Sequence, residues 1–154
     1  MEIKNFYGDV LSSTAELVCH GCNAKGVFNS GVAKAVRNKY PEVYAKYEDA
    51  YNKGLIKTGS IQVVDVSDDF DGKKIVNCIT QENYGYDGAK YTSYDALDTC
   101  MQKLRKYCEE HYIKSIAIPW HMCSDRGGGN WEIVTTIICE AFKDSNITIE
   151  VWKL

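Results

Sequence analysis

Short apolar runs alternate with longer stretches of helical periodicity, and this alternation constrains the fold more than any other feature of the chain. The apolar runs fit strands at residues 2–7, 16–20, 60–66, 74–79, 115–119 and 147–152. One helical pattern begins at residue 31, and three others cover residues 41–51, 97–108 and 131–142. Because strands that alternate with helices form sheets covered on their faces, we expect an α/β fold with helices on both sides.

Two neighbouring runs depart from this alternation. The runs at residues 60–66 and 74–79 are joined by a short turn at Asp68–Gly72, which favours a hairpin and an antiparallel pair. The run at residues 16–20 is expected to end at Gly21. The sequence therefore predicts a three-layer α/β/α fold with a mixed, mostly parallel central sheet.

The helix over residues 97–108 carries the clearest local signal. Its apolar positions recur at the spacing of one helical face, at Leu97, Cys100, Met101, Leu104, Tyr107 and Cys108. Pro41 fits the first turn of the helix at residues 41–51, where its missing amide costs nothing. Gly54 fits the end of that helix.

Size and composition fit a single domain over residues 1–154. Hydrophobic residues make up 45% of the chain and charged residues 25%, which excludes an intrinsically disordered protein. The formal net charge of -3 argues against a general nucleic-acid binder, because such proteins gain most of their affinity by neutralising phosphates. An anionic small molecule held by backbone amides stays compatible with this charge.

The seven cysteines are an odd number, so we expect free thiols in a reducing cytoplasm. No apolar run reaches the ~20 residues that a membrane span requires, and no secretory leader is recognisable in the first residues. Nothing in the pattern points to an obligate interface. We therefore expect a cytoplasmic monomer.

A glycine-rich segment joins the strand at residues 115–119 to the helix at residues 131–142. Residues 124–130 of this segment read Ser-Asp-Arg-Gly-Gly-Gly-Asn. Successive glycines let the backbone approach a ligand closely, and Asn130 can cap the helix, whose free amides favour a phosphate. A flexible turn with a good cap would explain the same residues. Because ligands of α/β sheets bind beyond the carboxyl ends of strands, we favour an anion site.

A second strand-to-helix segment, at residues 23–33, contains Gly26 and Gly31. Neither segment matches the P-loop or the dinucleotide-binding fingerprint. Two glycine-bearing turns at one sheet edge could hold a diphosphate from opposite sides.

His20 and Asp125 are the candidate catalytic residues. An imidazole with a pKa near 6.5 suits a nucleophile or a proton shuttle, although a buried structural histidine would fit the same position. Asp125 could orient water, stabilise an imidazolium or act as a base, or it could simply form a turn. Cys19 and Cys22 have the spacing of a redox or zinc pair. Zinc would need two further ligands, for which His121 and Cys123 are the candidates by spacing, but we expect buried thiols and no metal.

Several motifs taken together resemble the macro domain. They are Tyr7-Gly8-Asp9-Val10, Cys22-Asn23-Ala24-Lys25-Gly26, Ser30-Gly31-Val32-Ala33 and the glycine-rich segment before the last helix. The resemblance extends over essentially the whole chain. It implies a mixed sheet between helices, a cleft for ADP-ribose or ADP-ribose 1''-phosphate at the strand ends, and no cofactor.

The resemblance also implies roles for individual residues. Asp9 would accept a hydrogen bond from the adenine amino group, with Val10 alongside, and Asn23 would bind the distal ribose. That ribose and one phosphate would be held by Gly26, Ser30, Gly31 and Val32. The diphosphate would be wrapped by the backbone amides of Ser124, Arg126, Gly127, Gly128, Gly129 and Asn130.

Within the superfamily the chain is most similar to the branch of terminal ADP-ribose glycohydrolases and the ADP-ribose 1''-phosphate phosphatase. The glycohydrolases use a lysine after an Ile-Thr pair to form a covalent sugar adduct, and here Gln81 stands at that place. Lys90 could replace the lysine only if its loop folded inward. The phosphatases carry a His-x-Cys-Asn segment, which residues 20–23 resemble.

This resemblance favours hydrolysis of ADP-ribose 1''-phosphate, with His20 attacking phosphorus or protonating the leaving oxygen and Asp125 positioning water. A non-catalytic reader of ADP-ribose, free or on ADP-ribosylated protein, would need the same cleft but would not depend on His20. Hydrolysis of ADP-ribosyl or acyl-ADP-ribose esters is the third possibility.

Overall fold

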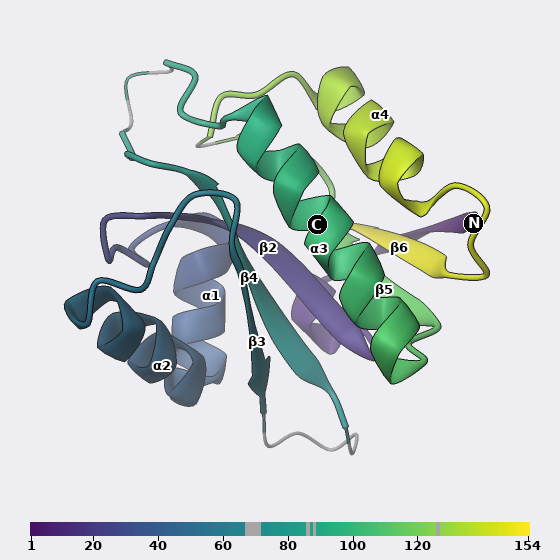
Figure 1. The fold of residues 1–154 in the computed structure, drawn as a ribbon, viewed down its shortest axis with the longest axis horizontal. Helices are drawn as coiled ribbons and strands as arrows, with labels where there is room; N and C mark the ends of the chain where they lie inside the picture. The colour runs from purple at the N-terminus through teal and green to yellow at the C-terminus, as the bar shows by residue number, and fades with distance from the viewer. Residues whose placement is uncertain (67–71, 86, 88, 126) are drawn as a thin grey trace.

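A computed structural model describes residues 1–66, 72–85, 87, 89–125 and 127–154. The described strands form one six-stranded sheet in the order β1-β6-β5-β2-β4-β3 (Figure 1). They are β1 (Glu2–Tyr7), β2 (Leu17–Asn23), β3 (Ile61–Asp65), β4 (Lys74–Gln81), β5 (Ser115–Pro119) and β6 (Thr148–Lys153). All neighbours are parallel except β3 and β4, which pair antiparallel. The predicted mixed, mostly parallel sheet is confirmed.

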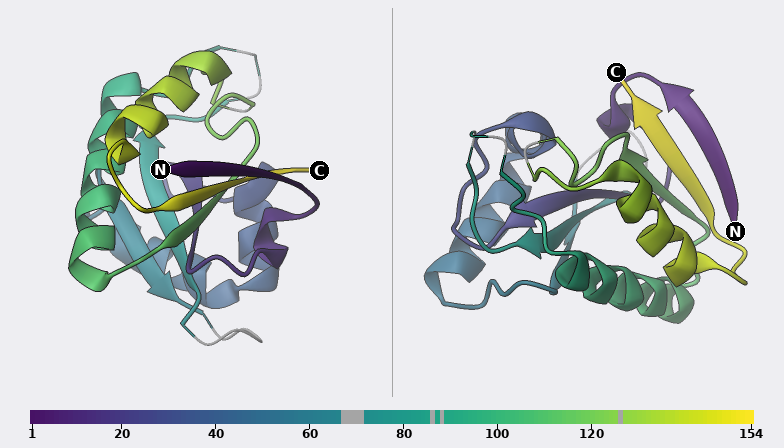
Figure 2. Two further views of the ribbon diagram at one scale, coloured as in Figure 1. Left: turned by 90° about the vertical axis from the view of Figure 1, so that its right-hand side faces the viewer. Right: turned by 90° about the horizontal axis from the view of Figure 1, so that it is seen from above.

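Helices cover both faces of this sheet (Figure 2). One face carries α1 (Gly31–Lys39) and α2 (Pro41–Asn52), and the other carries α3 (Tyr94–His111) and α4 (Trp131–Phe142). A short 3-10 helix at Val10–Ser12 follows β1. The three layers agree with the prediction from the sequence. Across the described residues, no helix combines the length and the apolar character needed to span a bilayer.

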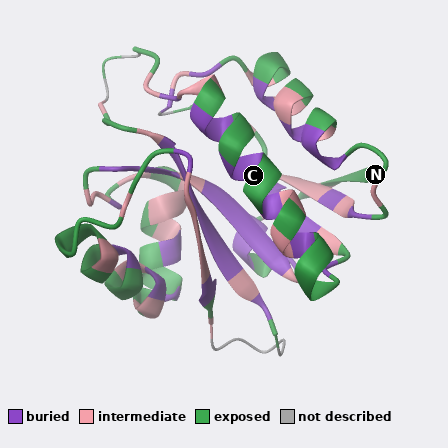
Figure 3. Cartoon of the chain, in the orientation of Figure 1, coloured by how far each residue is buried: buried purple, intermediate pink, exposed green. Residues whose placement is uncertain are grey.

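The side chains of β2 point alternately into two hydrophobic cores, one on each face of the sheet. Leu17 and Cys19 pack with α3 and α4, whereas Val18 and Cys22 pack with α1 and α2. The central strands β2 and β4 are buried almost throughout, while β1 at the edge is mostly exposed (Figure 3). Burial on both faces explains why the central strands read as continuous apolar runs.

Local residues set the ends of the helices. The Ser93 hydroxyl accepts a hydrogen bond from the Ala96 amide at 3.1 Å and so caps α3. Pro41 occupies the first turn of α2, and Gly54 adopts a left-handed φ of 72° beyond its end. Of the predicted hairpin turn Asp68–Gly72, all but Gly72 lies outside the described residues.

The end of β2 differs from the prediction. The strand continues through Gly21 to Asn23, because it stays paired with β4, which extends to Gln81. Gly21 permits close packing rather than ending the strand: a Cβ there would lie 3.0 Å from the Cys123 Sγ. His20 therefore lies inside β2 rather than at its end.

Candidate active site

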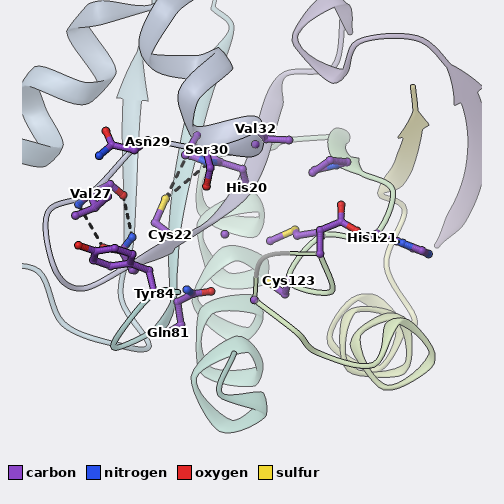
Figure 4. A pocket seen from close by; sticks show the side chains of 18 of the residues that line it. His20, Cys22, Val27, Asn29, Ser30, Val32, Gln81, Tyr84, His121 and Cys123 are labelled. Atoms are coloured by element: carbon purple, nitrogen blue, oxygen red, sulfur yellow. Dashed lines mark hydrogen bonds and ion pairs between the residues drawn. The ribbon is translucent and has the colours of Figure 1, made fainter. Parts of the chain in front are cut away.

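A pocket lies at the carboxyl edge of the sheet, where β2, β4 and β5 end (Figure 4). Its walls come from the β2–α1 turn (residues 24–30) and the β5–α4 turn (residues 120–130). The structure thus brings the two glycine-bearing turns to one place. The cavity measures about 140 Å³, whereas sites for drug-sized ligands measure ~300–1,000 Å³. It therefore suits one part of a larger ligand.

Asn23 holds the β2–α1 turn. Its Oδ1 accepts a hydrogen bond from the Lys25 amide at 2.9 Å, and its Nδ2 donates to the Val27 carbonyl at 2.8 Å. From α2, the Tyr47 hydroxyl donates to the Asn23 carbonyl at 2.6 Å and accepts from the Gly26 amide at 3.0 Å. Burial raises the pKa of the Tyr47 phenol, which keeps it protonated as a donor. Asn23 and Tyr47 together fix the shape of this turn.

The amino end of α1 opens onto the pocket. Ser30 occupies the N-cap position, but its side chain accepts no hydrogen bond from the helix. Gly31, Val32 and Ala33 line the pocket, and their amides have no partner in the described part of the chain. Free amides at a helix N-terminus, together with the helix dipole, favour an anion.

The amino end of α4 is closed instead. Asn130 Oδ1 accepts hydrogen bonds from the amides of Glu132 at 2.9 Å and Ile133 at 3.2 Å. The predicted capping role of Asn130 is confirmed. Since the cap satisfies these two amides, the open helix end at the pocket belongs to α1.

The β5–α4 turn uses many of its own amides. Three amides predicted to bind a diphosphate donate to carbonyls within the turn at 2.8 to 3.2 Å: those of Ser124, Gly128 and Gly129. The Asn130 amide donates to the Tyr94 hydroxyl at 3.0 Å. Among the described residues of this turn, the amides without a partner are those of His121, Cys123, Asp125 and Gly127. These four amides are the donors that the turn can offer a phosphate.

Thr92, just before α3, supports the β5–α4 turn from behind. Its buried hydroxyl donates to the Cys123 carbonyl at 2.8 Å, and its amide donates to the Gly127 carbonyl at 2.9 Å. A Cβ at Gly127 would lie 2.7 Å from the Cys123 carbonyl oxygen and closer still to the Thr92 hydroxyl. Glycine is required at position 127 by this packing.

His20 lines the pocket but is only 1% exposed. Its Nε2 lies 2.6 Å from Asn77 Oδ1. Because Asn77 Nδ2 donates to Gln62 Oε1 at 2.9 Å, Oδ1 faces the imidazole and His20 Nε2 carries the proton. Burial lowers the pKa of His20 to about 4, against the opposing effect of the Asn77 hydrogen bond. The imidazole is therefore neutral at pH 7, with Cys22 Sγ 3.7 Å from its Nδ1.

His121 and Asp125 face each other across the β5–α4 turn. His121 Nδ1 lies 3.5 Å from Asp125 Oδ1, and the two side chains are 31% and 74% exposed. The imidazole stacks on Trp120, with 3.3 Å between ring centroids, and the Trp131 ring lies 5.6 Å away. In Figure 4, His121 and Cys123 stand across the pocket from Cys22 and Ser30.

Gln81 lines the pocket and Lys90 does not. The Gln81 side chain donates from Nε2 to the Asn83 carbonyl at 2.7 Å. Lys90 lies in a second depression formed by residues 90–95, with its Nζ 4.4 Å from the centre of the Tyr94 ring. Among the described residues that line the main pocket, none is a lysine.

All seven cysteine thiols are free, as the sequence predicted. Burial raises the pKa of Cys22 well above its usual value and that of Cys123 to about 12. The thiols next to the pocket are therefore protonated at pH 7 and poor nucleophiles. Over the described residues, no group of three or more His, Cys, Asp or Glu side chains is placed to hold a metal ion.

The predicted site residues fall into three groups. Those that line the pocket are His20, Asn23, Ser30, Gly31, Val32, Asp125 and Gly127. Those that belong to the two turns without lining the pocket are Gly26, Ser124, Gly128, Gly129 and Asn130. Asp9 and Val10 lie away from it, and Asp9 Oδ1 accepts a hydrogen bond from the Leu11 amide at 2.9 Å. Arg126 lies outside the described residues.

Sequence reasoning gave no role in this pocket to three residues that shape it. Tyr47 and Thr92 act through hydrogen bonds from other elements, which no local pattern reveals. His121 could have been found from its position, since it precedes the glycine run by only a few residues. Its left-handed backbone, with a φ of 63°, is uncommon for a residue that carries a side chain.

Comparison with known proteins agrees with the fold. The "DNA ADP-ribosyl glycohydrolase" of Mycobacterium tuberculosis is 29% identical over 136 residues, which are 88% of this chain and 37% of that protein. The chain thus spans little more than a third of that relative's length. A 17.5 kDa protein from the tk-vs intergenic region of enterobacteria phage T4 is 27% identical, over 99% of this chain and 98% of its own.

Among solved structures, the macrodomain of Mycobacterium tuberculosis DarG superposes with a TM-score of 0.84 at 26% identity, over 97% of both chains. The family model of the Macro domain matches residues 19–138, which contain the pocket and both turns. The chain therefore belongs to the Macro domain family.

Proposed function

We propose that this chain binds ADP-ribose in the pocket and hydrolyses the bond that joins the distal ribose to DNA. One observation carries the proposal: two sets of backbone amides, unpaired within the described residues, converge on the pocket. One set lies at the amino end of α1 and the other in the β5–α4 turn. Such amides bind phosphates well, and two sets match the two phosphates of ADP-ribose.

The size of the cavity fits this arrangement. A cavity of about 140 Å³ has room for the distal ribose beside Asn23 and Gln81, while the adenosine half would extend out along the surface. Asp9 has one carboxylate oxygen bonded to the Leu11 amide. Its other oxygen would accept the hydrogen bond from the adenine amino group.

The names of the relatives support cleavage at the sugar, since two mycobacterial relatives are named DNA ADP-ribosyl glycohydrolase. Gln81 alters the route in this chain, because an amide cannot form a Schiff base with the sugar. Water must then break the ribosyl bond directly. The net charge of -3 is compatible with this substrate, since the pocket would recognise the attached ADP-ribose rather than the polyanion.

Hydrolysis of ADP-ribose 1''-phosphate has less support from the pocket. His20 is only 1% exposed, its Nε2 carries a proton that is bonded to Asn77, and its remaining lone pair, on Nδ1, lies 3.7 Å from the Cys22 Sγ, so neither nitrogen is placed to attack phosphorus. With a pKa lowered to about 4 by burial, the imidazole is also unable to protonate a leaving oxygen at pH 7.

A panel of three substrates tests the proposal. The purified chain is incubated with ADP-ribosylated single-stranded DNA, with a peptide that carries ADP-ribose as a glutamate ester, and with ADP-ribose 1''-phosphate. We expect free ADP-ribose and unmodified oligonucleotide from the first substrate, and no phosphate from the third.

Two other results would redirect the assignment. Binding of ADP-ribose by calorimetry with no release from any substrate would make the chain a reader. Release of phosphate from ADP-ribose 1''-phosphate, with no release from the other two substrates, would assign phosphatase activity to the chain instead.

A further inference from the structure

Few side chains in the pocket can exchange a proton with a bound molecule at pH 7. The described titratable residues that line it are His20, Cys22, Tyr84, His121, Cys123 and Asp125. The thiols of Cys22 and Cys123 have raised pKa values and stay protonated, and the His20 imidazole is bonded to Asn77. Besides the Tyr84 phenol, which is 46% exposed, His121 and Asp125 remain as one imidazole and one carboxylate, both accessible and in contact with each other.

The geometry of this pair fixes which nitrogen is available. With His121 Nδ1 at 3.5 Å from Asp125 Oδ1, the carboxylate favours the tautomer that carries its proton on Nδ1. Within the described residues His121 Nε2 makes no hydrogen bond, so its lone pair is free to accept a proton. Stacking on Trp120 holds the plane of the ring.

The backbone also points to a role for His121. Its φ of 63° and the Cys123 φ of 65° put two residues with side chains in the left-handed region of one short turn. Such conformations are strained and cluster at functional sites. The left-handed conformation at position 121 holds an imidazole in a position where glycine would be less strained.

We propose that His121 is the general base of this site, with Asp125 as its orienting partner; this inference rests on the proposed hydrolysis of the ribosyl bond. His121 Nε2 takes a proton from water while the water oxygen bonds to the anomeric carbon of the distal ribose. The bond from that carbon to DNA breaks, and its electron pair leaves with the DNA. The imidazolium, stabilised by the Asp125 carboxylate, then returns the proton to the leaving group.

Two substitutions at position 121 test the proposal without loss of the fold. Asn and Gly both tolerate the left-handed backbone, so His121→Asn and His121→Gly should unfold no earlier than the wild type. We expect each to lower kcat on ADP-ribosylated DNA by ~100-fold or more, the usual contribution of general acid–base catalysis. ADP-ribose affinity, measured by calorimetry, should change by less than about threefold, because the ring is assigned to the chemical step.

Added imidazole separates a chemical role from a structural one. His121→Gly leaves a space that free imidazole can fill, so we expect imidazole to restore part of its kcat and to leave His121→Asn unchanged. His111→Asn, at the exposed last residue of α3, is the matched control and should keep full activity.

The two proposals fail in different ways. If the wild type releases ADP-ribose from DNA and both position-121 variants do so within about threefold of its rate, the role of His121 is overturned and the proposed function stays intact. A wild-type chain that releases no ADP-ribose from DNA would overturn the proposed function, and this inference with it.

Discussion

At the scale of single residues, His20 shows how a titratable group can serve the fold by staying uncharged. Its pKa is lowered from 6.5 to about 4 because burial penalises the imidazolium. Between these two values the unfolded chain binds a proton that the folded chain does not. The free energy of unfolding must therefore fall as the pH drops from about 6.5 to 4. Below pH 4 this loss is complete.

His20→Gln should remove that dependence, because its amide can still donate to Asn77 Oδ1 but does not titrate. From pH 7 to pH 5 we expect the wild type to lose about 2 kcal/mol more unfolding free energy than the variant. Urea titrations of both chains at the two pH values measure the difference. Equal losses would mean that the folded chain protonates His20 as readily as the unfolded chain does.

Asn23 is the second residue with a measurable consequence. Asn23→Ala removes the side-chain hydrogen bonds to Lys25 and Val27 and leaves the partly buried Lys25 amide and Val27 carbonyl without these partners. We expect ADP-ribose to bind more weakly by about 1–3 kcal/mol, measured by calorimetry.

Tyr47→Phe provides a matched comparison for Asn23, since it loosens the same turn from the α2 side without touching the pocket. A loss in both variants would assign the effect to the shape of the turn. A loss in Asn23→Ala alone would assign it to a direct contact with the ligand, and native-like affinity in Asn23→Ala would contradict the placement of the ribose.

At the scale of elements, the β5–α4 turn depends on its contact with Thr92. Gly127→Ala would push a methyl group against the Thr92 hydroxyl and the Cys123 carbonyl. We expect a loss of stability of about 1–3 kcal/mol, as in other overpacked sites, and at least a tenfold loss of ADP-ribose affinity. Thermal unfolding and calorimetry measure the two effects.

The control for Gly127→Ala is Gly54→Ala. Gly54 has a left-handed φ of 72°, but a methyl group added there would meet no atom within 4 Å, and the residue does not line the pocket. Gly54→Ala should cost stability through the backbone alone and leave affinity unchanged. Unaltered binding in Gly127→Ala would show that the turn yields to the methyl group.

The elements themselves were predictable where the signal was local. The apolar stripe of α3 and the capping residue Asn130 each act within one segment, and both were predicted correctly. The predicted end of β2 was wrong because glycine usually interrupts a strand. Here its missing side chain makes room for Cys123, a residue distant in sequence.

At the scale of the whole molecule, the strand order determines where stability is greatest. β2 and β4 lie inside the sheet and are buried, whereas β1 lies at one edge, pairs only with β6 and is mostly exposed. We expect amide hydrogen exchange to be slowest in β2 and β4 and fastest, among the strands, in β1. Mass spectrometry of peptides from the three strands measures this, and equal protection of β1 and β2 would contradict it.

The strand order also explains which parts of the site could be predicted. Both turns were recognised from their glycines, and their meeting follows from β4 and β5 flanking β2 in the sheet. The sequence could not predict which amides stay unpaired, because that depends on the side chains of Tyr47, Thr92 and Asn130. For the same reason the open helix end was expected at α4 and is found at α1.

The parallel pairing of β1 with β6 has a practical consequence for handling the protein. It aligns Glu2 with Thr148 and Tyr7 with Lys153, so residue 154 follows a strand at the pocket edge while residue 1 precedes one at the opposite edge. A fluorophore coupled at residue 154 would sense an occupied pocket. An anchor coupled at residue 1 would fix the molecule to a sensor chip with its binding side facing the solution.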